Sequence, residues 1–235
     1  MRVAIMSDIH GFSLALDAVT ADIEATGPYD LVVVAGDHCE VGPDPAGVLQ
    51  RLQLHPEWIV LKGNTDDDLV VEALDGQADF AATEIGEEGV AWLANLPFSR
   101  RVMPSALADA QQSLLVVHAN PHDLRGRLDP SATDAELNDV LGDVVFGTIA
   151  FGHVHISFQR QLGDRHLVDV SAVGNSKDGD LRCAYGVFEW SGNDQRWLAE
   201  VRRIAYPPEA TLEQIRSSAL DHPDKVARVL QRATY

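Results

Sequence analysis

The feature of this sequence that most limits its fold is a series of short apolar runs rich in valine, isoleucine and leucine. Apolar runs of about four to eight residues, bounded by turn residues, are typical of strands buried on both faces. The runs occupy Arg2 to Met6, Leu31 to Ala35, Trp58 to Leu61, Leu114 to Val117 and Thr148 to Phe151. They predict a sheet with a largely parallel core.

Helical patterns separate the early runs. An amphipathic pattern covers Leu14 to Ala25, between the first two runs, and predicts a βαβ unit. A second helix is expected near Pro45 to Leu54, because the missing N–H of proline is harmless in the first turn of a helix. A helix-rich stretch follows from about Asp66 to Asn95 and ends at Pro97.

The later half of the chain has a different pattern. Arg160 to Val168, Ala184 to Trp190 and Gln195 to Ile204 are separated by Gly, Asp and Asn turns, as in an antiparallel meander. Helices are expected again over Pro208 to Ala219 and Pro223 to Ala233. We therefore expect an α/β fold of two sheets packed face to face with helices outside. Residues 1–235 form one domain in this interpretation, with 207–235 as a C-terminal helical extension.

The charge balance limits the partners of the chain. Its 18 Lys and Arg residues against 36 Asp and Glu residues give a formal net charge of -18. This charge opposes binding to a nucleic-acid polymer, whereas a small phosphorylated substrate stays compatible because a bound cation reverses the local field.

Three further features of the sequence indicate a cytoplasmic protein. No apolar run approaches the roughly 18 residues of a membrane helix, and no leader pattern is seen at the start. Cys39 and Cys183 are too few for a disulfide framework. We expect a soluble cytoplasmic protein without a membrane partner, and a homo-oligomer is left open.

Polar side chains follow each of the five apolar runs. They are Asp8 and His10 after the first, Asp37 after the second, Asn64 after the third, His118 after the fourth, and His153 and His155 after the last. Alone, an aspartate at a strand end is usually a turn residue, and a single histidine is usually structural. Together they predict a site, because the ligand crevice of an open α/β sheet lies outside the carboxyl ends of its strands.

The types of these side chains indicate metal chemistry. Carboxylate, amide oxygen and imidazole without thiolate favour divalent manganese, iron, zinc or nickel, and seven ligands are too many for one tetrahedral centre. Asp37 follows a central run and has two oxygens that could bridge two ions. Two ions about 3.5–4 Å apart lower the pKa of a trapped water and hold phosphate oxygens for in-line displacement.

Five blocks of the sequence then resemble the calcineurin-like metallophosphoesterases in order and spacing. They read SDIHG, GDHCEVGPDP, KGNTD, VVHANP and FGHVH. The block VSAVGNSKDGDLRCAYGVFE is similar to one in the small bacterial branch that includes the YfcE-like phosphodiesterases. The resemblance covers Arg2 to about Ile204. It implies a four-layer αββα sandwich of two mixed β-sheets flanked by helices, and phosphoester hydrolysis by a metal-bridging hydroxide.

The resemblance also implies a role for each candidate residue. The first metal would be bound by Asp8, His10 and His155, the second by Asn64, His118 and His153, and Asp37 would bridge both. Asp37, Asn64, Thr65 and His118 take the catalytic positions, and Asn64 and Thr65 are also placed to contact the substrate.

One position departs from the family pattern. Thr65 stands where most members have a histidine that contacts the phosphate and helps to protonate the leaving oxygen. A hydroxyl donates hydrogen bonds but is a poor proton donor near neutral pH, so we expect activated aryl or cyclic-nucleotide phosphodiesters as substrates. His38 and His122 flank motif residues and either replace the missing imidazole or lie at the surface near the cleft. Asn120 and Arg125 are candidate substrate contacts, and a surface role for Arg125 stays open.

Other interpretations remain at this point. One is a phosphatase acting on a phosphoprotein or a dinucleoside polyphosphate. Another is a non-catalytic metal-binding scaffold, as in the retromer subunit of this fold, although the complete ligand set opposes it. The acidic run Asp66 to Asp68 is interpreted as the start of a helix rather than a third metal site. Val41 to Asp44 and His122 to Leu128 are expected to form the pocket walls.

Overall fold

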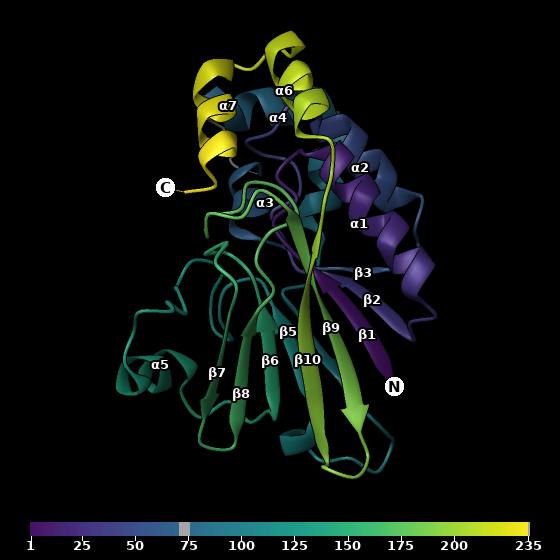
Figure 1. The fold of residues 1–235 in the computed structure, drawn as a ribbon, viewed down its shortest axis with the longest axis vertical. Coiled ribbons are helices and arrows are strands. Elements are labelled where there is room, and N and C mark those ends of the chain that lie inside the picture. Colours follow the sequence, from purple (N-terminus) through teal and green to yellow (C-terminus); the bar gives the residue numbers. More distant parts are fainter. Residues whose placement is uncertain (71–75, 235) are drawn as a thin grey trace.

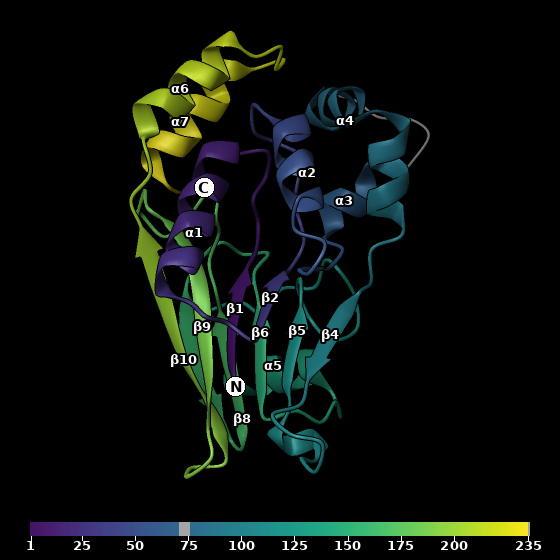
Figure 2. The same cartoon turned by 90° about the vertical axis from the view of Figure 1, so that its right-hand side faces the viewer.

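Two five-stranded β-sheets packed face to face form the centre of the computed structural model, which describes residues 1–70 and 76–234 (Figure 1; Figure 2). Sheet A has the order β10 (Arg196–Ile204), β9 (Cys183–Ser191), β1 (Arg2–Met6), β2 (Leu31–Val34) and β3 (Ile59–Val60). Sheet B has the order β4 (Ser99–Val102), β5 (Leu114–Val117), β6 (Thr148–Phe151), β8 (Arg165–Asp169) and β7 (Phe158–Leu162). Each sheet contains parallel and antiparallel pairs.

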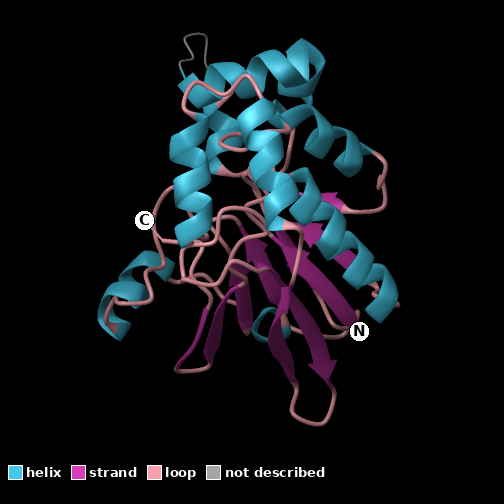
Figure 3. Ribbon diagram, turned by 45° about the horizontal axis from the view of Figure 1, so that its top comes forward, coloured by secondary structure: helices cyan, strands magenta, loops and turns pink. Residues whose placement is uncertain are grey.

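Most helices gather beyond one end of the strands (Figure 3). The described α-helices are α1 (Ser13–Thr26), α2 (Pro45–Gln53), α3 (Asn64–Asp68), α4 (Gly76–Ala94), α5 (Asp134–Leu141), α6 (Pro208–Ser217) and α7 (Pro223–Arg232). The strands β1, β2 and β3 lead into α1, α2 and α3 in turn, so their connecting loops lie at that same end. In Figure 1, α5 lies apart from the other helices, beside sheet B.

Alternate residues of β1 belong to different layers, because successive side chains of a strand point to opposite faces. Val3 and Ile5 pack in the core between the sheets with Val116 of β5. Ala4 and Met6 pack instead in the core beneath α1. The outer face of sheet B packs against α5 in the same way. These layers confirm the predicted αββα sandwich.

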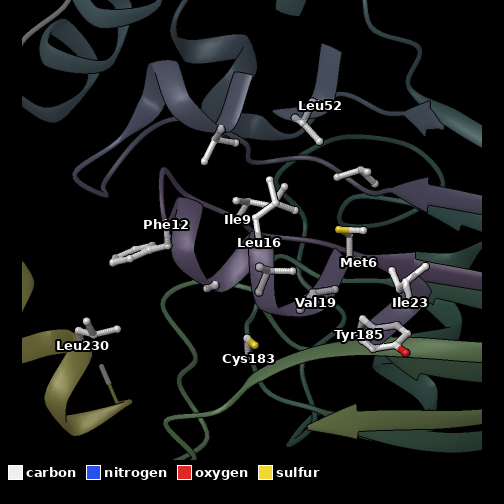
Figure 4. Close-up of a cluster of buried hydrophobic side chains, with 14 of the residues drawn as sticks. Met6, Ile9, Phe12, Leu16, Val19, Ile23, Leu52, Cys183, Tyr185 and Leu230 are labelled. Carbon is white, nitrogen blue, oxygen red and sulfur yellow. The ribbon is translucent and has the colours of Figure 1, made fainter. Parts of the chain in front are cut away.

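The two C-terminal helices complete the core on the α1 side of sheet A. Figure 4 shows this cluster from Met6 and Ile23 at one side to Leu230 of α7 at the other. Ile215 of α6 and Leu230 are 0% and 6% exposed. The predicted helices of the 207–235 extension are thus present and packed onto α1, and the assignment of the whole chain to one domain stays a prediction.

The later strands differ from the predicted meander. Arg160 to Val168 is not one strand but parts of the hairpin β7–β8, which turns at Gly163. β8 pairs with β6 in sheet B, whereas β9 pairs with β1 in sheet A. The two halves of the chain therefore do not correspond to the two sheets. Local patterns cannot show this, because sheet membership depends on pairing between distant segments.

The sequence patterns do not predict β4, α5 or the short 3-10 helix Ala110–Gln112. β4 has no apolar run, since three of its four residues are exposed. α5 begins with a capping box of Thr133 and Glu136, which is a readable signal for a helix start. The predicted stretch Asp66 to Asn95 contains α3 and α4, and its residues 71–75 lie outside the described part. Among the described residues, none of the helices has the length and apolar character needed to cross a membrane.

Candidate metal centre

The seven side chains predicted as ligands come together at the ends of five strands. They are Asp8 and His10 after β1, Asp37 after β2, Asn64 at the start of α3, His118 after β5, and His153 and His155 after β6. Their donor atoms form two adjacent groups. In the first, the nearest donor atoms of Asp8, His10 and His155 lie within 4.8 Å of one another. His155 Nε2 is 3.0 Å from Asp8 Oδ1 and 3.2 Å from His10 Nε2.

The second group is centred on His118. Its Nε2 lies 3.0 Å from Asn64 Oδ1 and 3.2 Å from His153 Nδ1. Asp37 stands between the groups, with Oδ2 3.5 Å from His10 Nε2 and Oδ1 3.4 Å from His118 Nε2. One carboxylate oxygen therefore faces each group, which is the arrangement that a bridging ligand requires.

Each of the four histidines has its other ring nitrogen against a backbone carbonyl. The acceptors are the carbonyls of Glu40 for His10 (3.0 Å), Ala35 for His118 (2.9 Å), Arg125 for His153 (3.0 Å) and Asn175 for His155 (2.8 Å). Because a carbonyl can only accept, these ring nitrogens carry the proton, and the neutral ring then presents a lone pair to the centre.

This donor set fits divalent cations. Two ring nitrogens with lone pairs repel each other at 3.2 Å, so a proton or a metal cation is needed between them. Asp8 Oδ1 is buried and has no hydrogen bond of acceptable geometry, which leaves a lone pair for an ion. Metal–ligand bonds of about 2.0–2.2 Å place neighbouring donors roughly 3.0–3.6 Å apart, close to the separations observed here.

The pKa shifts of Asp37, His10 and His153 favour the same interpretation. Burial raises the pKa of Asp37, but the positive charge of His118 and His10 outweighs burial and leaves that pKa below its ordinary value. Burial lowers the pKa values of His10 and His153. Ionised carboxylate and neutral imidazole are the forms that bind metal. The pKa of His155 is shifted the other way, because the adjacent Asp8 outweighs the effect of burial, and this favours a protonated ring when no cation is bound.

Five of the seven side chains sit on left-handed backbone. The φ angles are 56° for Asp8, 51° for His10, 56° for Asp37, 68° for His153 and 58° for His155. Left-handed φ is uncommon outside glycine and costs about 1–3 kcal/mol where it is strained. Its concentration at one cluster marks the loops as shaped for function rather than for local stability.

The loop after β2 also needs glycine at Gly36. Its φ is +98°, and a Cβ there would lie 2.7 Å from His118 Nδ1. The chain must therefore pass close to the ring that faces Asp37.

Thr65 and the two alternative histidines occupy different surroundings. Thr65 Oγ1 is buried and has no hydrogen-bond partner, while the Thr65 N–H donates to Asp37 Oδ1 at 2.9 Å. His38 is 0% exposed and its Nε2 donates to the Leu61 carbonyl, so the expectation of a surface residue is wrong. His122 is exposed and its Nε2 lies 3.2 Å from the Leu141 carbonyl, at the end of α5.

Two of the four predicted substrate contacts, Asn120 and Arg125, bind other residues of the chain in this structure. Both ends of the Asn120 amide bind the following loop, with Nδ2 donating to the Gly126 carbonyl and Oδ1 accepting from the His122 N–H. Arg125 forms a two-pronged ion pair with Asp68 at 2.5 and 3.3 Å. Contact of Asn120 or Arg125 with a substrate stays a prediction.

Sequence reasoning did not identify the residues that support the ligands. The backbone carbonyls have no sequence signal at all. Asp66 was interpreted only as a helix-start acid, yet it is 0% exposed and binds the backbone around Asp37. Its burial could not be read from an acidic run.

An αββα sandwich with carboxylate and imidazole donors gathered at its strand ends is an arrangement found in metal-dependent hydrolases. The calcineurin-like phosphoesterase superfamily domain matches residues 1–192, and the chain belongs to this superfamily.

Solved structures share the fold. A metallophosphoesterase from Sphaerobacter thermophilus is 23% identical with a TM-score of 0.80, and all of both chains is covered. A hypothetical protein from Pyrococcus horikoshii is 14% identical with a TM-score of 0.83 over 97% of each chain. The E. coli phosphoesterase YfcE is 21% identical with a TM-score of 0.54 over 87% of this chain and 100% of its own. A search of curated proteins found no significant match.

Proposed function

We propose that this chain is a dinuclear metal-dependent phosphodiesterase that hydrolyses small phosphodiesters of the activated aryl or cyclic-nucleotide type. The observation that carries the proposal is the position of Asp37, whose two oxygens face two separate donor groups at 3.5 and 3.4 Å. When bound there, two divalent ions would supply an activated water and positive charge for the phosphate oxygens.

Backbone groups of the chain hold the candidate metal ligands in place. The four backbone carbonyls orient the imidazoles, and the Thr65 N–H fixes one oxygen of Asp37. Thr65 Oγ1 has no hydrogen-bond partner among the described residues, so a turn of this side chain toward the substrate would let the hydroxyl donate to a phosphate oxygen without breaking a bond. This positioning of groups before the reaction is a main source of catalysis in phosphoryl transfer.

The substrate class follows from the missing proton donor. His38 is fully buried and bonded to Leu61, and His122 is bonded to Leu141, so neither ring is held toward the donor groups. An alkoxide leaving group then departs without help from a general acid. The absence of a general acid typically lowers the rate by about 10²–10⁴-fold. Aryl and cyclic phosphodiesters are less affected, because their leaving oxygens are more acidic or strained.

Removal and return of metal tests this function directly. Chelation is expected to abolish hydrolysis of bis-p-nitrophenyl phosphate, and Mn²⁺ is expected to restore it, because the donor groups cannot bind phosphate oxygens without cations. Activity and elemental content are measured together, and close to two ions per chain are expected.

Two results would count against the proposal. One is a folded protein that stays inactive with Mn²⁺, Ni²⁺, Fe²⁺ and Zn²⁺. The other is metal content well below one ion per chain after purification without chelators, which favours a scaffold. A panel that includes a phosphopeptide and a dinucleoside polyphosphate separates the phosphatase alternatives from the phosphodiesterase.

Introducing the family imidazole tests the role of position 65. Thr65→His is expected to raise kcat/KM for an alkyl phosphate monoester by about 10²-fold relative to bis-p-nitrophenyl phosphate, because the ring can protonate a poor leaving group. Thr65→Asn is the control, since it changes the size of the side chain without adding a proton donor. An unchanged substrate ratio in a folded, metal-loaded Thr65→His protein would show that the proton donor lies elsewhere.

A further inference from the structure

Asp66 is a fully buried carboxylate beside the candidate metal centre, and it has no place in the function proposed above. It is the third residue of α3 and is 0% exposed. Its oxygens accept three backbone N–H groups, from Gly63 at 2.7 Å, Asp37 at 2.9 Å and His38 at 3.0 Å. Hydrogen bonds to an ionised carboxylate are roughly twice as strong as those between neutral groups.

These three donors belong to two different loops. Asp37 and His38 follow β2, whereas Gly63 follows β3 and precedes the ligand Asn64. A single carboxylate therefore ties the loop of the bridging residue to the loop of a ligand from the second group. Only one of the three bonds, to Gly63, is the local capping bond that a helix-start acid makes.

The α3 segment also binds the side chain of Asp37. The Thr65 N–H donates to Asp37 Oδ1 at 2.9 Å, so α3 holds the Asp37 backbone through Asp66 and the Asp37 side chain through Thr65. The approach is so close that a Cβ on Gly63 would lie 2.1 Å from Asp37 Oδ1.

The backbone of Asp37 needs such an anchor. Its φ of 56° is left-handed, and a residue in this conformation persists only where its surroundings fix it. The two bonds from Asp66 hold the N–H groups on both sides of the Asp37 α-carbon. A small rotation there would swing Asp37 Oδ2 and Oδ1 away from His10 and His118, which they now face at 3.5 and 3.4 Å.

We propose that Asp66 is a positioning residue. Its three backbone hydrogen bonds hold Asp37 so that one oxygen of the Asp37 carboxylate faces each donor group. This role rests on the proposed function, because it assumes that Asp37 bridges two ions. Asp66 itself touches neither substrate nor metal in this arrangement and acts through the main chain of Asp37 and His38.

Asp66→Asn tests the role with little change in shape, because it replaces one acceptor oxygen by an NH₂ group that faces a backbone N–H. We expect kcat for bis-p-nitrophenyl phosphate and the affinity for the second Mn²⁺ each to fall by about 10–100-fold, as for other residues that orient metal ligands. KM is expected to stay within about threefold, since Asp66 does not reach the substrate. Electron paramagnetic resonance should show loss of the exchange-coupled signal of a carboxylate-bridged Mn²⁺ pair.

Asp67→Asn is the matched control. It removes the same charge from the next residue of the same helix, but the Asp67 side chain is 51% exposed and pairs with Lys62 at 3.6 Å. Wild-type metal content, resonance signal and kcat within about twofold are expected for this variant.

The outcomes separate this proposal from the proposed function. If wild-type protein neither binds two ions nor hydrolyses diesters, the proposed function fails before any variant is measured. If wild type does both and folded Asp66→Asn keeps the wild-type kcat and both ions, with only a lower melting temperature, Asp66 is structural and the positioning role is overturned.

A second measurement covers the case in which Asp66→Asn does not fold. In ¹⁵N spectra of the wild type, the amide protons of Asp37, His38 and Gly63 should be shifted downfield and protected from exchange, as expected for bonds to a buried carboxylate. Ordinary shifts with rapid exchange at these amides would show that the three bonds do not exist, and would overturn the proposal.

Discussion

Replacing Asp37 by asparagine is expected to lower kcat for bis-p-nitrophenyl phosphate on the order of 10³-fold, because bridging charge worth several kcal/mol is lost and each 1.4 kcal/mol is tenfold in rate. An amide keeps one oxygen, so it can serve one donor group but presents an NH₂ group to the other. Two ions on the His10 and His118 sides, which the two oxygens now face at 3.5 and 3.4 Å, could then not both be ligated by this side chain. The assay is kcat at saturating Mn²⁺, with elemental analysis of the same sample.

The control for Asp37→Asn is again Asp67→Asn, which makes the same chemical change on an exposed side chain nearby. Metal content is expected to fall below two ions per chain in Asp37→Asn only. Full activity in Asp37→Asn, with two ions still bound, would contradict a bridging role and would leave the two groups as independent sites.

The positions of the candidate ligands could be predicted because they depend on a short-range pattern and one topological rule. Asp8, Asp37 and His118 each follow an apolar run, and parallel strands bring their carboxyl ends to one edge. No knowledge of the loops was required. The convergence of side chains up to 147 positions apart therefore follows from strand direction within each sheet and from the face-to-face packing of sheets A and B.

The groups that orient the candidate ligands could not be predicted, because they come from loops that are distant in the sequence. The carbonyl of Asn175 accepts from His155 across 20 positions, and Asp66 accepts from Asp37 across 29. Any residue type offers a carbonyl, so its sequence carries no signal. The acid at Asp66 differs from Asp67 only in burial, which is set by the approach of the β2 loop.

A position next to a candidate ligand in the sequence does not place a side chain at the site, as His38 shows. His38 follows Asp37 directly, yet their side chains diverge, because the Asp37 backbone is left-handed and the chain turns there. The His38 ring enters the protein interior and donates to Leu61. A neighbour of a ligand is thus not necessarily a neighbour of the site, and the direction of its side chain has to be known.

The largest stability effect is expected at the partly buried ion pair of Asp178 and Arg203. Their side chains are only 14% and 16% exposed, and Asp178 also accepts from Ser176 Oγ at 2.8 Å. Asp178→Asn leaves the partly buried Arg203 charge without its ion-pair partner, which costs about 2 kcal/mol. For a chain of this length the melting temperature should fall by roughly 4–8 °C, as measured by calorimetry at pH 7.

The stability lost in Asp178→Asn is expected to decrease as the pH falls. Burial raises the pKa of Asp178, but hydrogen bonds from Arg203 and Ser176 outweigh burial and leave that pKa below its ordinary value. Its stabilisation is therefore fully present above the unfolded-state pKa of about 3.9 and is lost as the pH falls through the lower folded value. The difference in unfolding free energy between wild type and Asp178→Asn should be constant near neutral pH and shrink below about pH 4.

A double-mutant cycle measures whether the stability lost in Asp178→Asn comes from its interaction with Arg203. Adding Arg203→Gln to Asp178→Asn removes the unpaired charge, so the double variant should be more stable than the sum of the single losses predicts. Asp17→Asn is the matched control, because the Asp17–Arg51 pair lies on the surface with side chains 50% and 31% exposed, and the melting temperature of this variant should stay within about 2 °C of wild type. Strict additivity of the two single losses would show that Arg203 does not depend on Asp178. The expected coupling would instead show that the two charges depend on each other, in the loop that also holds Asn175, the carbonyl acceptor of His155 at the candidate metal centre.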